Sequence, residues 1–152
     1  MMARIYLVVM DETAEARKAL RFAARRAANT GGAVHILALV PQHSFNAFGS
    51  VQATIEQEAQ ERAEVLANSE AGNLFAEYGK RPTITVRQGD PHKVIRDYLA
   101  EYDDVAALVL AASVDNSPGP LVSHFSAAAG TLTCPLYIVP GNLSNEAIDE
   151  LA

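Results

Sequence analysis

Short apolar runs alternate along the chain with longer stretches in which apolar side chains recur every three or four positions. The runs are continuous rather than interleaved with polar residues, which is typical of strands buried on both faces of a parallel sheet. This pattern predicts five strands, at 5–10, 33–40, 83–86, 105–112 and 136–139.

The stretches between the predicted strands have helical spacing. The first helix is predicted to begin near Thr13, a residue type that caps helices, and to stop at Gly31. Residues 41–52 lack a clear period and are predicted to form a loop, and Gly72 is a candidate for a bend in the long helix that follows. The expected helices cover 13–30, 53–78, 91–102, 121–132 and one or two turns of the tail 141–152.

The strict alternation of strands and helices predicts an α/β fold. We expect a single doubly wound open sheet of five parallel strands, with helices on both faces. In such sheets, ligands bind beyond the carboxyl ends of the strands, where the strand order reverses. The positions where a ligand site is expected are therefore 10–11, 40–41, 88–89 and 112–113.

Composition narrows the classes of function. The 152 residues carry 12 Lys and Arg against 18 Asp and Glu, and the resulting charge of −6 argues against nucleic-acid and membrane-surface partners. The longest apolar run, 105–112, is far shorter than the roughly 20 residues that span a bilayer. Cys134 is the only cysteine, which excludes an intrachain disulfide and a cysteine zinc cluster. We expect one compact domain located in the cytoplasm.

Several segments carry a resemblance to a known family. They are IYLVVMDETAEARKAL, AVHILALVP, GDPHKVI, LVLAAS and TCPLYIVP, in this order over about 140 residues. On these segments the chain resembles the universal stress protein family, with 1–140 as the domain and 141–152 as a C-terminal tail. The resemblance implies a Rossmann-like sheet of strand order 3-2-1-4-5, similar to the adenine nucleotide alpha hydrolases. It also implies a role in stress or starvation responses, and homodimers formed through the last strand.

The resemblance implies, too, where a nucleotide would bind. Family members that bind ATP carry a phosphate loop, G-x2-G-x9-G-[ST], after the fourth strand. Asp11 matches the aspartate near adenine and ribose, Val40 the valine whose backbone meets adenine, and Ser123 the final hydroxyl beside the phosphates. The candidate nucleotide cleft comprises Asp11, Val40, Gly89, Ala112, Gly119 and Ser123.

The glycines of that phosphate loop are missing here. The third glycine position falls on Val122, and with the family's spacing the second falls on Ala112 and the first on Val109. If the first is placed at Ala112 instead, the loop is three residues too short, and neither placement finds a glycine. A phosphate loop works because unhindered backbone N–H groups approach the anion. In this chain Val122 places a branched side chain there, and Pro118 and Pro120 remove two donors.

Asp115 adds a negative charge to the same segment. At about 5 Å and an effective dielectric constant near 20, it repels each phosphate charge by roughly 3 kcal/mol before screening. We therefore expect no dependence on ATP and no required cofactor. The alternative is a sensor of ATP or AMP with Mg²⁺, in which Gly119 and Ser123 form an unconventional phosphate loop.

The three matched residues also have purely structural interpretations. Asp11 can cap the first helical region, and Ser123 can cap the helix that begins near it. Val40 stands at a strand end that is apolar in almost any parallel sheet. These residues support a binding site only when taken together.

Catalytic and metal-binding constellations are not evident. His35, His43, His92 and His124 are scattered, without a ligand spacing such as H-E-x-x-H. His35 is expected in the core, and His92 is expected either in solvent or near a ligand. The pair Ser123–His124 lacks the G-x-S-x-G turn of a nucleophile elbow, and Cys134 is expected to pack as a small hydrophobe. We expect neither enzymatic activity nor a bound metal.

The last predicted strand is the expected dimer interface, formed by Leu136, Tyr137, Ile138 and Val139. An unprotected sheet edge is normally paired or covered, and the flanking prolines would limit the pairing to a short segment. The prediction is a stress-response homodimer that acts through an unidentified protein partner or by binding another small ligand in the same cleft.

The first helix carries five of the twelve basic residues. One interpretation is a solvated face on an acidic protein, and the other is a docking patch for an acidic partner or second protomer. The residues are Arg17, Lys18, Arg21, Arg25 and Arg26.

Overall fold

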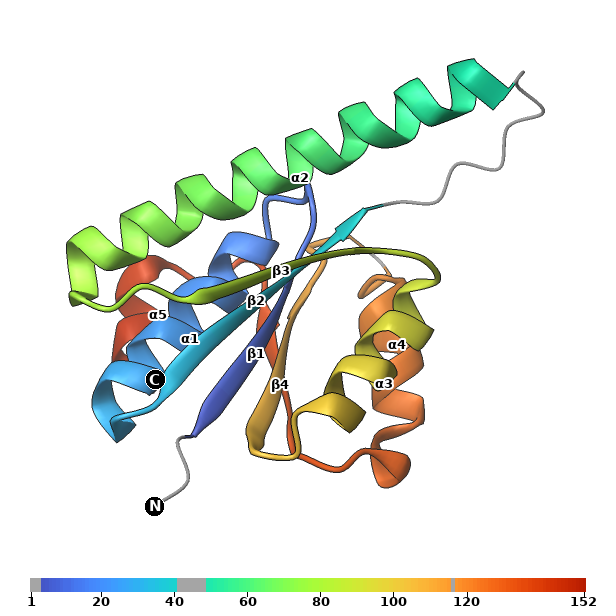
Figure 1. The fold of residues 1–152 in the computed structure, drawn as a ribbon. Coiled ribbons are helices and arrows are strands. Elements are labelled where there is room, and N and C mark those ends of the chain that lie inside the picture. The colour runs from blue at the N-terminus through green and yellow to red at the C-terminus, as the bar shows by residue number, and fades with distance from the viewer. Residues whose placement is uncertain (1–3, 41–48, 116) are drawn as a thin grey trace.

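The computed structural model describes residues 4–40, 49–115 and 117–152 (Figure 1). Its centre is a parallel sheet of five strands in the order β3-β2-β1-β4-β5. The predicted α/β class and the strand order implied by the resemblance are both confirmed. The strands are β1 (Ile5–Met10), β2 (Ala33–Val40), β3 (Thr83–Gln88), β4 (Val105–Ala112) and β5 (Leu136–Pro140).

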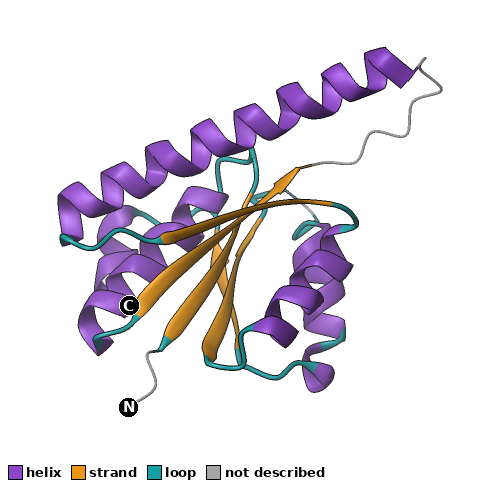
Figure 2. Cartoon of the chain, viewed as in Figure 1, coloured by secondary structure: helices purple, strands orange, loops and turns teal. Residues whose placement is uncertain are grey.

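Helices cover both faces of this sheet (Figure 2). One face is covered by α1 (Ala16–Thr30), α2 (Gly49–Tyr78) and α5 (Asn145–Leu151). The other face is covered by α3 (Pro91–Glu101) and α4 (Pro120–Ala127), which a short 3-10 turn, η1 (Ala129–Thr131), follows.

The central strand β1 shows why apolar runs form a sheet covered on both faces. All of its residues are buried, and successive side chains enter opposite cores. Val8 and Met10 pack toward α1 and α2, whereas Leu7 and Val9 pack toward α3 and α4. The buried stripe of α1 is mostly alanine, and these small side chains let the helix lie close to the sheet.

The first helix begins later than predicted. It starts at Ala16, and Glu15 at its N-cap makes no side-chain capping bond. Asp11 explains the delay, because its Oδ1 accepts hydrogen bonds from the backbone N–H of Thr13, at 3.0 Å, and from the Thr13 hydroxyl. The Thr13 side chain is thereby held in a turn and does not cap the helix.

The second helix is longer than predicted and has no break. α2 includes residues 49–52, which the sequence pattern assigns to a loop, and it continues through Gly72. A Cβ at Gly72 would meet nothing within 4 Å, so packing does not require a glycine there. The remainder of that predicted loop, 41–48 with His43, lies outside the described residues.

The C-terminal tail folds back onto α1 and confirms the predicted helical turns. Ser144 is the N-cap of α5, and its Oγ accepts a hydrogen bond from the backbone N–H of Ala147 at 3.1 Å. Ile148 is fully buried in the core that α1 and α2 share. The tail therefore contributes to the packed interior of the domain.

Several basic side chains of α1 contact the neighbouring helices of the same chain. Arg17 Nε lies 3.0 Å from Glu70 Oε1 on α2, and Arg21 makes two hydrogen bonds to Asp149 on α5. Lys18 Nζ donates to Asn145 Oδ1 at 3.3 Å. These contacts join α1 to its neighbouring helices, a role that neither sequence interpretation of the basic face includes.

Candidate functional site

The parallel register brings the predicted ligand positions to one edge of the sheet, here called the carboxyl edge. Met10 pairs with Ala38, Val40 with Gln88, and Ala112 with Pro140. The turns that follow these strands therefore leave the sheet on the same side, as expected for an open α/β sheet.

A pocket of about 90 Å³ lies at this edge, between the turn after β1 and the turn before α4. We call it the carboxyl-edge pocket. Asp11, Thr13 and Glu15 line it from the first turn, and residues 118–120 line it from the second. The structure thus brings together two of the sequence candidates, Asp11 and Gly119, which are far apart along the chain.

Asp11 lies between two hollows. Besides the carboxyl-edge pocket, it lines a neighbouring pocket of about 80 Å³ whose wall includes Ala38 from β2 and Ala59 and Leu66 from α2. Its Oδ1 is occupied by Thr13, as described above. Asp11 therefore shapes the turn after β1 and, at the same time, presents negative charge to both hollows.

Gly119 forms the N-cap of α4, with φ +101° and ψ 156°. L side chains rarely adopt this φ, so the position favours glycine. Pro120 occupies the first helical position and donates no N–H. The N–H groups of Leu121 and Val122 have no acceptor within the helix, because the first turn of any helix leaves its donors unpaired. Ser123 N–H is already bonded to Gly119 O at 3.0 Å.

The other four candidates stand at the edge without lining this pocket, as far as the described residues define it. Ser123 is exposed, and Gly119 rather than Ser123 occupies the N-cap of α4. Val40 is buried at the end of β2. Gly89 has φ +144° next to Val94, and the Ala112 carbonyl accepts the N–H of Gly141 at 2.9 Å.

The charge and size of the carboxyl-edge pocket do not suit a triphosphate. Asp11 and Glu15 contribute carboxylates, and its described lining holds no Lys, Arg or His. Asp115, expected to oppose phosphates, is exposed and lies outside that lining, so Glu15 takes its place as the second acidic group. Small-molecule pockets usually measure about 300–1,000 Å³. The described lining of this pocket therefore does not suit the bare phosphates of ATP.

A stacked pair of histidines lies near the same edge and has no counterpart in the sequence predictions. The rings of His92 on α3 and His124 on α4 have centroids 3.8 Å apart and planes inclined by 18°. Burial lowers the pKa of His124, and the nearby His92 and Arg96 lower it further. His92 is thus packed against a second imidazole, which neither alternative from the sequence anticipated. The pair is far apart in sequence, so no local pattern signals it.

Two further titratable side chains are structural. His35 is buried in the sheet, as predicted, with Nδ1 2.7 Å from the hydroxyl of Tyr98. Burial lowers the pKa of His35. Burial raises the pKa of the Cys134 thiol, which packs beside the core under α3 and α4 as predicted for a small hydrophobe.

The β5 edge exposes less apolar surface than its sequence suggests. Val139 is buried, Tyr137 packs edge-on against Phe22 with ring centroids 5.7 Å apart, and Leu136 is partly buried. Ile138 is 40% exposed. In the described sheet β5 pairs with β4 on one side and has no strand on the other.

Neither a metal cluster nor a membrane span is found in the part of the chain that the structure describes. Across 4–40, 49–115 and 117–152, no group of three or more His, Cys, Asp or Glu side chains is arranged to hold a metal ion. Among the helices of these same segments, none is both long and apolar enough to cross a membrane.

The sequence profile of the universal stress protein family matches residues 2–140. No curated protein matches the chain. The match ends at the last residue of β5, so α5 lies beyond it.

Solved structures of similar fold include several universal stress proteins. The protein UspA from Lactobacillus plantarum has a TM-score of 0.77 at 17% identity, covering 91% of this chain and 99% of its own. The Archaeoglobus fulgidus protein in complex with dAMP has a TM-score of 0.54 at 19% identity, with coverages of 91% and 99%. An Arabidopsis thaliana family protein with AMP bound has a TM-score of 0.55 at 15% identity, with coverages of 90% and 91%. At such identities the likeness shows the shared fold.

Proposed function

The chain belongs to the universal stress protein family, and on this premise we propose that it is a non-enzymatic stress-response protein of the cytoplasm. It acts as a homodimer, through association with a protein partner, and does not depend on ATP. The observation that carries this proposal is the lining of the carboxyl-edge pocket, where two carboxylates and two prolines stand where phosphates would need counter-charge and N–H donors.

Homodimer formation is supported by the free edge of β5. An exposed apolar edge strand normally pairs with another strand or is covered. Ile138 keeps 40% of its surface exposed at this edge, and Pro140 ends the strand without an N–H donor. Pairing of two β5 strands would bury Ile138 over a short segment, which favours a closed dimer over a continuing fibre.

A second candidate function is an adenine-nucleotide sensor. It is favoured by two structural relatives that hold dAMP and AMP, and by the position of Asp11 between two hollows. Adenine and ribose would lie near Asp11 and Val40, with phosphate and Mg²⁺ near Gly119 and Ser123. A monophosphate needs fewer donors than a triphosphate, and the N–H groups of residues 121 and 122 supply two.

Mass spectrometry of the purified protein under native conditions tests both parts of the proposal at once. We expect a species of twice 16.3 kDa without retained nucleotide. A stoichiometric adenine nucleotide in the preparation would support the sensor instead. A species of 16.3 kDa at micromolar concentration would remove the homodimer from the account.

A further inference from the structure

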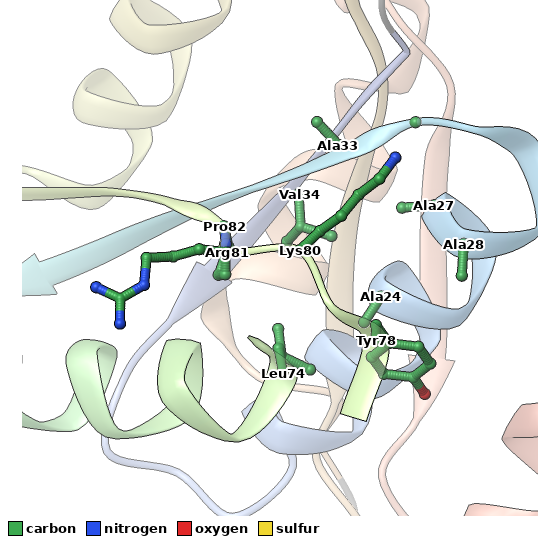
Figure 3. Close-up of a pocket in the computed structure, with 11 residues that line it drawn as sticks. Ala24, Ala27, Ala28, Ala33, Val34, Leu74, Tyr78, Lys80, Arg81 and Pro82 are labelled. Carbon is green, nitrogen blue, oxygen red and sulfur yellow. The ribbon is translucent and has the colours of Figure 1, made fainter. Parts of the chain in front are cut away.

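A hollow at the opposite edge of the sheet has no role in the proposed function. This pocket of about 220 Å³ lies where α1 and α2 end and where β2 and β3 begin (Figure 3). We call it the amino-edge pocket. It lies at the opposite ends of the strands from Asp11 and Gly119, because parallel strands place all their starts together. A ligand here would bind independently of the carboxyl-edge pocket.

The walls of the amino-edge pocket are apolar. Ala24 and Ala27 of α1, Val34 of β2 and Leu74 of α2 surround it, and the ring of Tyr78 closes one side (Figure 3). The hollow exists because alanines stand where larger side chains would fill the space between the two helices. An engineered apolar cavity of about 150 Å³ binds benzene, so 220 Å³ accommodates a ring with a short substituent.

A cation stands at the mouth of the pocket. In Figure 3 the Lys80 side chain extends toward Ala27 and Ala33, whereas Arg81 points away from them. Arg81 lies instead over the ring of Phe75, 5.8 Å from its centroid. Within the described residues Lys80 makes no ion pair or hydrogen bond.

The acidic residue closest to Lys80 in the sequence pairs with a different cation. Glu77, three residues earlier, is directed toward Arg21 at 3.9 Å. The chain has a net charge of −6. The Lys80 ammonium group nevertheless lies beside an apolar hollow without an ion-pair partner among the described residues. It complements a ligand with an apolar body and a single negative charge.

We propose that the amino-edge pocket binds a small aromatic monocarboxylate. The ring lies among Ala27, Leu74 and Tyr78, and the carboxylate pairs with the Lys80 ammonium group at the solvent-exposed mouth. The 3-phenylpropionate ion is a suitable probe because it joins an apolar ring to a carboxylate through a flexible two-carbon arm. With about eleven heavy atoms, it should bind with a Kd on the order of 0.1–1 mM.

The first test compares three probes by titration, followed by amide chemical shifts. We expect 3-phenylpropionate to shift resonances of residues 24–34 and 74–82, and 3-phenylpropanol to bind about two- to fivefold more weakly because it lacks the charge. Acetate, which lacks the ring, should not bind measurably. Equal affinity of the acid and the alcohol, or no shift with the acid at millimolar concentration, would overturn the proposal.

Two pairs of variants make the test specific to this pocket. Lys80→Gln should weaken binding of 3-phenylpropionate about two- to fivefold, whereas the same change at Lys93, an exposed lysine on α3, should leave it unchanged. Ala28→Leu adds bulk at the pocket wall and should weaken binding at least tenfold, whereas Asn29→Leu, next to it but outside the wall, should not. Ala28 and Asn29 are both exposed on α1, so these variants should fold. Equal effects within either pair would place the ligand elsewhere.

Discussion

The guanidinium of Arg21 on α1 makes two parallel hydrogen bonds to the carboxylate of Asp149 on α5, Nε to Oδ1 at 2.9 Å and Nη2 to Oδ2 at 2.7 Å. This hydrogen bonding lowers the pKa of Asp149. The pair joins a helix inside the family match to a helix beyond it. α5 is therefore held both by this bidentate contact and by the burial of Ile148.

Replacing Ile148 with alanine should lower the free energy of unfolding by about 2–4 kcal/mol, because the side chain is fully buried and leaves a cavity. Urea denaturation measures the change. Leu151→Ala is the control on the same helix: Leu151 is 65% exposed, and its removal should change the free energy by about 0.5 kcal/mol or less. Similar values for both variants would mean that α5 does not pack as described.

Replacing either of two glycines with alanine should change the free energy of unfolding, in opposite directions. At Gly141 a Cβ would lie 2.5 Å from the Ala112 carbonyl oxygen and 2.9 Å from Glu15 Cβ, so Gly141→Ala should cost about 1–3 kcal/mol. At Gly72 nothing lies within 4 Å, and Gly72→Ala should stabilise the protein by about 0.5–1 kcal/mol as a helix-interior substitution. Urea denaturation of the two variants measures both signs. A destabilising Gly72→Ala would indicate that α2 is broken at this residue.

The stacked histidines predict a pH dependence of stability. Because the pKa of His124 is lowered in the folded protein, the neutral ring is favoured there, and its contribution is complete above the unfolded pKa near 6.5. That contribution is lost as the pH falls below 6.5 toward the folded pKa. His35, whose pKa is also lowered, acts in the same direction. The charge of Asp90 raises the pKa of His124 and so opposes this shift, whereas the charge of Arg96 lowers the pKa further.

Side-chain NMR titration should place the pKa of His124 below 6.5. His124→Phe keeps a ring beside His92 but cannot titrate, so its melting temperature should fall less between pH 7 and pH 5 than that of the wild type. A His124 pKa at or above the ordinary value, or an unchanged pH profile in the variant, would contradict this account of the stacked pair.

If the proposed homodimer forms through β5, Ile138→Lys should convert it to a monomer, because two β5 strands brought edge to edge would place charged side chains in the apolar contact. Sedimentation velocity measures the change. Val65→Lys on α2 is the control, since Val65 is 69% exposed and lies away from β5. A dimer that persists in Ile138→Lys would move the interface to another surface.

Sequence patterns predict the sheet well because burial on both faces leaves a continuous apolar run. β1 and β4 begin and end where the runs at 5–10 and 105–112 do. Helix starts are harder, because they depend on individual hydrogen bonds. Thr13 is a residue type that often caps helices, but here its hydroxyl donates a hydrogen bond to Asp11 and the helix begins three residues later.

Contacts between distant residues leave no local signal. Arg21 and Asp149 are 128 positions apart, so a basic stripe that looks like a docking patch is in part a helix-joining surface. Within the candidate site, Asp11 and Gly119 come together as expected, but Ser123 lies one turn into α4 because Gly119 takes the cap. The sequence alone shows that the phosphate-loop glycines are missing. That Glu15 lines the carboxyl-edge pocket can be seen only in the folded structure.

The most direct test of the central claim is the melting temperature with and without millimolar Mg-ATP. A ligand at about 100 times its Kd adds roughly 2.7 kcal/mol, which for a chain of this size raises the melting temperature by roughly 5–10 °C. AMP and adenosine, measured in parallel, separate binding of the base from binding of the phosphates. We predict no change with any of the three. A rise of several degrees with Mg-ATP would contradict nucleotide independence and make the protein a nucleotide sensor.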